Sequence, residues 1–167
     1  TKIWFSEGEI IGAELEHYLL EKARLCSQGE GERNYHIFHE IFAAPIDVQE
    51  KLKLDDVKPS HFTYMKKGDV FTNKIEGITD SDRFHITRDT LALLEVSQQD
   101  IQNIFEILAG IMHLGQIRFI ATDGNDDKAM IDPSTIRSVE NVCQLFQLSV
   151  EDFSERIVIR QIEVVGD

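Results

Sequence analysis

The sequence predicts a mainly α-helical fold with a few short peripheral β-strands, and three observations support this prediction. The first is a run over 97–114 in which apolar residues recur at steps of three and four. The second is the same spacing in two further stretches, 33–44 and 136–146. The third is that strand-like residues occur only in short runs, the first of them near the N-terminus. We therefore expect a helical body with short strands at its periphery.

The helix predicted for 97–114 is the central element around which the others are expected to pack. Ser97 is predicted to cap its start, with Asp100 close to the capping-box position. Gly115 is predicted to end it in a left-handed conformation, and Ala109-Gly110 forms a small patch that a neighbour can approach closely. The apolar stripe consists of Ile101, Ile104, Phe105, Leu108, Ile111 and Met112, with Ile107 and Leu114 beside it. A helix that is apolar nearly all round belongs inside a domain.

A hairpin is predicted at 1–15, ahead of the helices. Ile3-Trp4-Phe5 and the stretch from Glu9 to Ala13 are typical of two short strands around a turn that contains Gly8. Gly12 lies within the second strand, where a glycine indicates a β-bulge or the close approach of another group. The apolar run from Leu15 to Leu25 fits either a strand or a helix, and its spacing does not decide between them.

Two helices are predicted next along the chain. The first covers 33–44 and is ended by Pro45, because proline cannot continue a helix. The second is short, covers 48–54 and is expected to be capped by Asp47.

A third helix is expected to begin at Asp80, again with the aspartate as its cap. Its inward-facing residues are predicted to be Phe84, Thr87, Leu91 and Leu94. Before it, Val70-Phe71 and Ile75 flank a polar turn that fits an edge hairpin. Glu95-Val96 links this helix to the central one.

After the central helix we expect a strand at 117–121, a loop at 122–129 and a helix that starts at Asp132-Pro133, since an N-cap followed by proline is a typical helix start. Its inward stripe is predicted to be Ile136, Val139, Val142, Cys143 and Phe146. Ser149 is predicted to cap one or two further turns, as far as Phe153. Both 157–159 and 162–164 are predicted to be extended.

Composition limits the classes of function. The 167 residues fit one domain or one subdomain of a larger protein, and a 42% apolar content is enough for a core. The formal net charge of −13 argues against nucleic acid or anionic membranes as partners. No apolar run reaches the roughly 18 residues of a membrane span. Cys26 and Cys143 favour two inert thiols in a reducing, intracellular setting over a disulfide.

Three local patterns resemble parts of binding sites, but each of them lacks a residue that such a site requires. Gly29-Glu30-Gly31 lacks the lysine and hydroxyl residue of a phosphate loop, and its glutamate would repel an anion. The acidic stretch 123–127 has Lys128 where a calcium loop needs glycine. His36 and His39 share a helix face, but no third metal ligand is within evident reach. No catalytic arrangement of residues is recognisable, so the residues alone predict an α-rich domain without an active site of its own.

Three segments, in the right order and spacing, resemble the motor domain of myosins. The chain has GERNYHIF from Gly31 to Phe38, preceded by the LLEK-x-R run from Leu19 to Arg24. Phe105 to Ile117 is similar to the myosin segment FxILAGILHLGNI, and Ile75 to Asp80 to the IxGVDD turn. The motif residues that carry the resemblance are Gly31, Glu32, Arg33, Asn34, Tyr35, His36, Ile37, Phe38, Leu108, Ala109, Gly110, His113, Leu114 and Gly115.

The resemblance implies a part of an actin-based, ATP-driven motor with a P-loop NTPase-type fold. On this mapping 1–167 is one subdomain on the upper side of the actin-binding cleft, and 1–15 corresponds to outer strands of the transducer sheet. The family's GESGAGKT and NxNSSRFG loops would precede Thr1, and its DxxGFE switch would follow Asp167. The resemblance therefore implies no catalytic, nucleotide-binding or metal-binding residue in this chain. ATP and magnesium would belong to the intact motor, whose loops perform phosphoryl transfer.

The implied partners are actin filaments, through the intact motor, and the remainder of the motor domain, in the cytoplasm with the cytoskeleton. Neither nucleic acid nor membrane insertion is expected. We hypothesise that Glu21, Lys22 and Arg24 couple the transducer to the cleft, because they directly follow the predicted hairpin. The alternative role is that of charged residues that anchor a strand end.

Two positions depart from the family pattern: His39 replaces a usual tyrosine, and Glu95 replaces the glycine of an LGFS-like link. Neither bears on chemistry in the family picture. The other readings of the whole chain are a scaffold module derived from a myosin head and an unrelated acidic domain that binds a basic partner.

Overall fold

The computed structural model describes residues 1–14, 16, 21–66, 74–122 and 125–159. About half of these residues are helical, and the strands are short, as predicted. The helices are α1 (Ala23–Cys26), α2 (His36–Phe42), α3 (Ile46–Lys51), α4 (Asp80–Leu93), α5 (Gln98–Leu114), α6 (Ile136–Phe146) and α7 (Val150–Ile157), with 3₁₀ turns at Pro59–His61 and Pro133–Thr135. The strands are β1 (Lys2–Ser6), β2 (Glu9–Glu14), β3 (Lys74–Ile75), β4 (Ile78–Thr79), β5 (Phe119–Thr122) and β6 (Asn125–Ile131).

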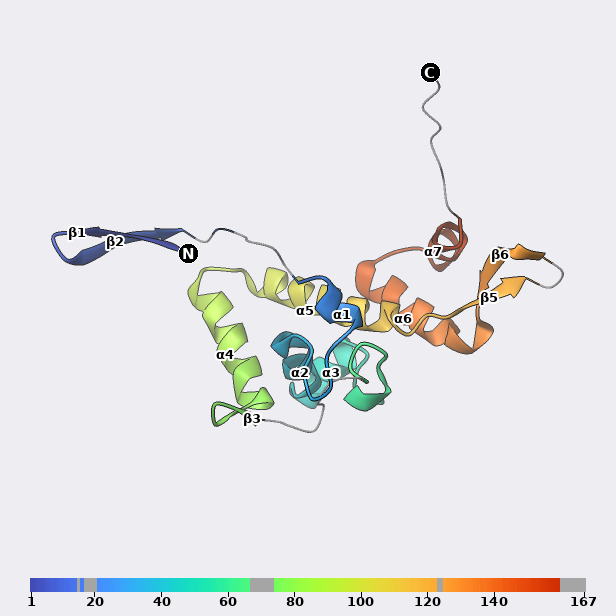
Figure 1. The fold of residues 1–167 in the computed structure, drawn as a ribbon, viewed down its shortest axis with the longest axis horizontal. Coiled ribbons are helices and arrows are strands. Elements are labelled where there is room, and N and C mark those ends of the chain that lie inside the picture. Colours follow the sequence, from blue (N-terminus) through green and yellow to red (C-terminus); the bar gives the residue numbers. More distant parts are fainter. Residues whose placement is uncertain (15, 17–20, 67–73, 123–124, 160–167) are drawn as a thin grey trace, which may run out of the picture.

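The strands form three separate antiparallel hairpins at the periphery of the helices (Figure 1). In the first, a two-residue turn with positive φ at Glu7 and Gly8 joins β1 to β2, which suits the twist of a hairpin. Trp4 pairs with Gly12 and Phe5 with Ile10, so Ile11 is the extra residue of a β-bulge. The predicted hairpin is confirmed; the bulge lies beside Gly12, at Ile11, and the side chain of Trp4 approaches Gly12 closely.

The helical body is built around α5, which packs against α2, α4 and α6. Its N-cap is Ser97, whose side-chain oxygen accepts a hydrogen bond from the amide of Asp100 at 3.1 Å, as predicted. The buried apolar core consists of Phe38, Ile41, Ala44, Leu52, Leu54, Phe62, Met65, Phe84, Ile101, Phe105, Ala109, Met112 and Leu145. Ile104 and Ile107 are exposed, and the buried face of α5 continues instead through Ala109 and His113.

Two glycines, Gly110 within α5 and Gly115 at its C-cap, allow close packing. A Cβ atom at Gly110 would lie 2.1 Å from Cε1 of Phe146, so the ring of Phe146 in α6 rests directly on the backbone of α5. This confirms the predicted patch at Ala109-Gly110. Gly115 was predicted to be left-handed, and this is wrong: its φ is −64°. It is covered by Tyr64, whose ring atoms would lie 2.6 Å from a Cβ.

Two predicted helix caps are wrong. Thr79, and not Asp80, caps α4, because Thr79 has the extended backbone of an N-cap and accepts from the amide of Asp82. Asp80 lies in the first turn and is buried. The helix after Pro45 is α3, which starts at Ile46, so Asp47 lies in its first turn and Pro45 occupies the cap position. At the other end of α4, Leu94 is exposed and not inward-facing, because Glu95 turns the chain with a φ of 63°.

The C-terminal part contains three further corrections. The loop predicted for 122–129 is largely strand β6. Its backbone pairs with β5, and this pairing outweighs the low strand propensity of its side chains. Ile157 belongs to α7 and is not extended, since it lies on the helical face of Phe153, four residues earlier. Ile136, predicted to face inward, is exposed.

A short hairpin, β3–β4, forms at 74–79 with its turn at Glu76-Gly77, which is not the turn between Phe71 and Ile75 that the sequence predicted. The predictions for Leu15, 18–20, Val70-Phe71 and 162–164 lie outside the described residues. Within the described ranges, no helix is both long and apolar enough to cross a membrane.

Candidate functional site

The segment from Glu21 to Tyr35 leads from the N-terminal hairpin into the helical body, and its polar side chains form one connected cluster with the start of α4. We call this cluster the charged junction. It consists of Glu21, Arg24, Glu32, Arg33, Asn34, Tyr35 and Asp80. The junction therefore links α1 and the start of α2 to α4, elements that are far apart in the sequence.

The strongest contact of the charged junction is the ion pair between Arg33 and Asp80. Arg33 donates from Nη1 to Oδ1 of Asp80 at 3.0 Å and from Nη2 to Oδ2 at 2.7 Å. Both side chains are only 9% exposed. A bidentate, charge-assisted pair fixes orientation as well as distance. The pair therefore holds α4 in one position relative to the segment before α2.

Arg24 connects α1 to the same segment. Its Nε donates to Oε2 of Glu21 at 2.7 Å, its Nη1 donates to the carbonyl oxygen of Arg33 at 3.3 Å, and Glu32 lies 3.6 Å away. The hydrogen bond from Arg24 to Glu21, with the charge of that carboxylate, raises the pKa of Arg24 above its ordinary value. Since Arg33 also binds Asp80, the two arginines form a chain from α1 to α4.

Asn34 is a buried polar residue, 3% exposed, that ties three segments together. Its Nδ2 donates to the carbonyl oxygens of Leu25 at 3.2 Å and Tyr64 at 2.7 Å, and its Oδ1 accepts from the amide of Tyr35 at 2.8 Å. Both donors of the amide are thus used, which an apolar residue of the same size could not reproduce. Asn34 anchors α1 to the loop that packs on the end of α5.

Tyr35 completes the anchoring of α1. Its hydroxyl donates to the carbonyl oxygen of Glu21 at 2.6 Å, and its ring lies edge-on to Phe38 with centroids 6.2 Å apart. Lys22, by contrast, lines an apolar groove of about 430 Å³ beside Leu25 and Leu108. Of the three residues that the sequence suggested for coupling, the structure places Glu21 and Arg24 in the charged junction and Lys22 in this groove.

The remaining residues of the first motif shape the turn and the core. Gly31 has a φ of 74°, which favours glycine. Glu32 accepts from the amide of Gly29 at 3.2 Å, so its carboxylate occupies a position that an anion would need. In α2, Phe38 is buried, Ile37 is half-buried and His36 is exposed.

In the second motif, packing dominates. Ala109 and Gly110 are buried beneath α6, and Leu108 and Leu114 are half-buried. His113 is buried, with its ring edge-on to Phe62 at 5.3 Å between centroids. Burial lowers the pKa of His113 below its ordinary value of 6.5, although backbone hydrogen bonds at Leu52 and Lys53 act in the opposite direction. The neutral ring is thus the form that fits the core.

Sequence reasoning missed three contributors. It assigned Asp80 to a helix cap, because both Thr79 and Asp80 can accept from helix amides. It gave Tyr64 no role, although its carbonyl oxygen holds Asn34. It also missed the bond from Thr87 to the buried Glu40 at 2.7 Å, which joins α4 to α2. In each of these contacts the two residues are at least 30 positions apart in the sequence. The sequence indicates such contacts only by placing Arg, Asn or Glu in an otherwise apolar segment.

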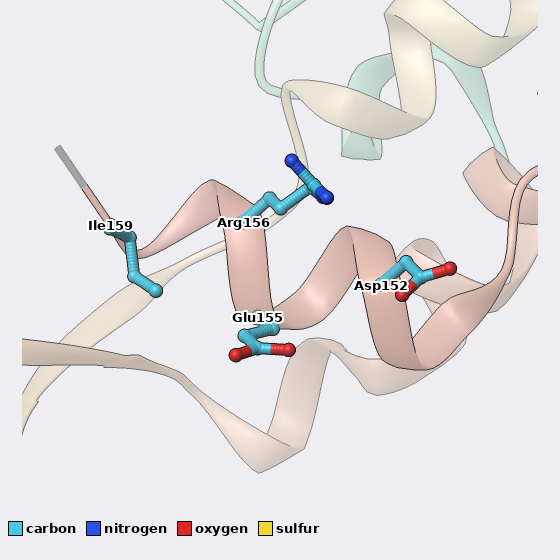
Figure 2. A pocket seen from close by; sticks show the side chains of 4 residues that line it. All are labelled: Asp152, Glu155, Arg156 and Ile159. Atoms are coloured by element: carbon cyan, nitrogen blue, oxygen red, sulfur yellow. The ribbon is translucent and has the colours of Figure 1, made fainter. Parts of the chain in front are cut away.

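The pocket on α7, lined by described residues, does not present a converging set of reactive groups. In the pocket of about 320 Å³ on α7, the guanidinium of Arg156 points away from the carboxylates of Asp152 and Glu155 (Figure 2). In the part of the chain that the structure describes, no group of three or more His, Cys, Asp or Glu residues is placed to hold a metal ion.

Known proteins resemble this chain over almost its whole length. It is 33% identical to Myosin-3 of Arabidopsis thaliana over 168 aligned residues, which cover 99% of this chain and 14% of that protein. It is also 33% identical to unconventional myosin heavy chain 6 of Caenorhabditis elegans, over 98% of this chain and 8% of that protein. The chain thus spans less than a sixth of either relative. A model of the myosin head (motor domain) family matches residues 2–167, and the chain therefore belongs to the myosin motor-domain family.

Proposed function

We propose that this chain is part of an actin-based, ATP-driven motor, in which it supplies the rigid body of the upper side of the actin-binding cleft and outer strands of the transducer sheet. Family membership supports the motor, and the helical body around α5 supports the mechanical role. The chain itself would not hydrolyse ATP. The nucleotide, its magnesium ion and the P-loop NTPase-type fold would belong to the whole motor, which would act on actin filaments in the cytoplasm.

The observation that carries this proposal is the buried pair of Arg33 and Asp80. Movement of the N-terminal hairpin reaches the helical body through the segment 21–35, and the pair fixes that segment to α4. A stiff, buried link transmits a small displacement without absorbing it, and packed bodies respond by switching between discrete arrangements. Glu21 and Arg24 extend the link to α1.

The experiment compares two substitutions in a motor domain that contains this chain. Asp80→Asn removes the charge that pairs with Arg33, whereas Asp56→Asn removes the exposed partner of Arg137 and serves as a matched control. The readouts are the basal ATPase rate and its stimulation by actin. We expect Asp80→Asn to lower the stimulation at least tenfold with a smaller change in the basal rate, and Asp56→Asn to change neither.

Equal stimulation in Asp80→Asn and in the unmodified motor, with both folded, would contradict the coupling role. A motor without any actin-dependent ATPase would contradict the wider proposal. Lys22→Ala is a second comparison, because Lys22 follows the hairpin but lines the apolar groove. We expect it to affect coupling less than Arg24→Met, which breaks the bond to Glu21.

A further inference from the structure

The C-terminal end of α5 holds the segment 52–65, which follows α3. The side chain of Gln116 forms two hydrogen bonds with the backbone of this segment: Nε2 donates to the carbonyl oxygen of His61 at 3.0 Å, and Oε1 accepts from the amide of Thr63. The ring of Tyr64 lies on Gly115, where a Cβ atom would be 2.6 Å from it. The apolar side chains of the segment pack in or against the buried core. The position of 52–65 therefore depends on its contacts with α5.

His113 is the buried member of these contacts. It is 3% exposed, and its ring lies edge-on to Phe62. It forms hydrogen bonds with the backbone of Leu52 and Lys53, and these bonds act to raise its pKa. A bond with this effect runs from a ring N–H to a carbonyl oxygen, because such an oxygen favours the protonated ring. The φ of Lys53 is 60°, a left-handed conformation that favours glycine, so the chain turns sharply where its backbone meets the ring.

The second ring nitrogen of His113 decides which protonation state suits this position. Nε2 is buried and has no hydrogen-bond partner among the described residues. The N–H that donates to the backbone is therefore on Nδ1, and the neutral ring carries no hydrogen on Nε2. A second proton would add an N–H without an acceptor, together with a charge that is removed from water. Both cost free energy in a buried site. The contacts around the ring therefore suit its neutral form.

We propose that His113 is a pH-sensitive latch, which holds the segment 52–65 on α5 while its ring is neutral and releases the segment when its ring is protonated. Release also reaches the charged junction, because the carbonyl oxygen of Tyr64 holds the side chain of Asn34. The latch lies within this chain and acts without actin or nucleotide. It therefore goes beyond the proposed function and stands independently of it.

Charged groups on the elements packed against α5 act on His113 in opposite directions. Burial is the largest effect and lowers the pKa of His113. The carboxylate of Asp56, in the segment 52–65, raises this pKa, and the guanidinium of Arg137, in α6, lowers it. These two groups form an exposed ion pair with each other. The α2 helix adds the buried His39 and Glu40, and the Glu40 carboxylate accepts from a hydroxyl of α4. His39 is therefore the second histidine that the test must control.

The lowered pKa of His113 fixes the direction of the pH dependence. A released ring has the ordinary pKa of 6.5 and binds a proton more tightly than the latched ring does. Well above pH 6.5 neither form is protonated, so the latch stays closed. Below pH 6.5 protonation favours release, by about tenfold for each pH unit until the pKa of the latched ring is reached. A fall from pH 7.5 to pH 5.5 should therefore increase opening of 52–65 severalfold, and at most about tenfold.

The test is hydrogen exchange, followed by mass spectrometry, in a motor domain that contains this chain. Peptides from 52–65 and from α6 are compared at pH 7.5 and pH 5.5, after correction for the intrinsic pH dependence of exchange. The amides of Leu54, Phe62 and Met65 are hydrogen-bonded and belong to buried residues, so they report opening of the segment. We expect their corrected exchange to rise severalfold at pH 5.5, while exchange in 136–146 stays the same.

Two histidine variants assign the effect to one ring. His113→Gln keeps a side-chain N–H donor but cannot gain a proton, so the difference in exchange between the two pH values should disappear. His39→Tyr, which removes the other buried histidine, should keep the difference. A dependence that is lost with His39→Tyr and kept with His113→Gln would overturn the proposal.

A second pair of variants leaves both histidines in place, so it tests the latch even where His113→Gln does not fold. Asp56→Asn and Arg137→Gln break the same exposed ion pair. Asp56→Asn should lower the pKa of His113 further and enlarge the rise in exchange at acidic pH, whereas Arg137→Gln should reduce this rise. A shift of the same sign in both variants would contradict the latch, because it would reflect only loss of the ion pair.

Two results in the unmodified protein would also overturn the proposal. Corrected exchange in 52–65 that is equal at pH 7.5 and pH 5.5 would show that no release occurs. An equal rise in 52–65 and in 136–146 would show that acid loosens the whole helical body and not the segment that His113 holds.

Discussion

At the scale of single residues, the chain places side chains in positions that carry a measurable strain or desolvation cost. Glu95 is the clearest example of strain. It follows the C-cap of α4 with a φ of 63°, and the amides of Glu95 and Val96 bond back to Ala92 and Leu91. This pattern is the Schellman motif, in which glycine is the usual residue. The motor-domain pattern also has glycine here. The glutamate of this chain therefore places a Cβ atom in a left-handed conformation that glycine adopts without strain.

Glu95→Gly is expected to stabilise the chain by about 0.5–1 kcal/mol. The left-handed conformation costs a residue with a Cβ atom about 1–2 kcal/mol, and the greater chain entropy of unfolded glycine removes part of the gain. Urea denaturation of the two proteins measures the difference. Glu95→Ala is the control, because it removes the charge but keeps the Cβ; a gain as large as that of glycine would assign the effect to charge.

His113 gives the chain a pH-dependent stability. Its pKa in the folded state is lowered, chiefly by burial, so the unfolded chain binds the proton more tightly. The contribution of the neutral His113 ring to the free energy of unfolding is complete above its ordinary pKa of 6.5. This contribution is lost as the pH falls from there through the pKa of the folded state. We expect the free energy of unfolding to fall between pH 7.5 and pH 5.5, and His113→Gln to make this dependence shallower. The exposed His36→Gln is the control, and an equal effect of both variants would contradict the assignment.

At the scale of elements, the position of each helix depends on one or two close contacts. Gly110 determines how near α6 comes to α5, since a methyl group there would overlap Phe146. Gly110→Ala should therefore destabilise the chain by about 1–3 kcal/mol, even though alanine favours a helix over glycine by about 1 kcal/mol. Thermal unfolding measures the loss. Combining Gly110→Ala with Phe146→Leu should recover part of it, and strictly additive effects would contradict the contact.

The pair of Arg33 and Asp80 fixes α4 to the segment before α2. Asp80→Ala leaves the Arg33 guanidinium buried without its partner, which costs about 3–5 kcal/mol. Asp56→Ala breaks an exposed pair with Arg137 and should cost less than about 1 kcal/mol. Denaturation of Asp80→Ala, Arg33→Met and the double variant tests the coupling, because the double variant should be more stable than Asp80→Ala.

Sequence reasoning succeeded where the physical cause is local. The cap at Ser97 and the hairpin around Glu7-Gly8 follow from residues that are near each other in the sequence. It failed where the cause is distant. Asp80 has the chemistry of a cap, and only the fold brings Arg33 to it over 47 positions. The error at β6 has a nearer cause: a loop was predicted for 122–129, whereas pairing with the adjacent β5 makes 125–131 a strand.

At the scale of the whole molecule, the chain consists of an apolar N-terminal hairpin and a helical body that contains the charged junction. Family membership places the chain in a motor domain, and the proposed role requires that α1 and α4 move as one unit. The contacts of Arg24, Arg33 and Asn34 support such a unit, because each links two or more segments by buried or charge-assisted hydrogen bonds.

The most direct test measures the distance between α1 and α4 in a motor domain that contains this chain. Spin labels at Ala23 and Asp89, which are both exposed, report this distance with and without ATP. The account predicts one narrow distance distribution that nucleotide does not change, and a broader distribution in Asp80→Asn together with weaker actin stimulation. A distance that changes with nucleotide in the unmodified motor would contradict it, because the charged junction would then be a hinge and not a rigid link.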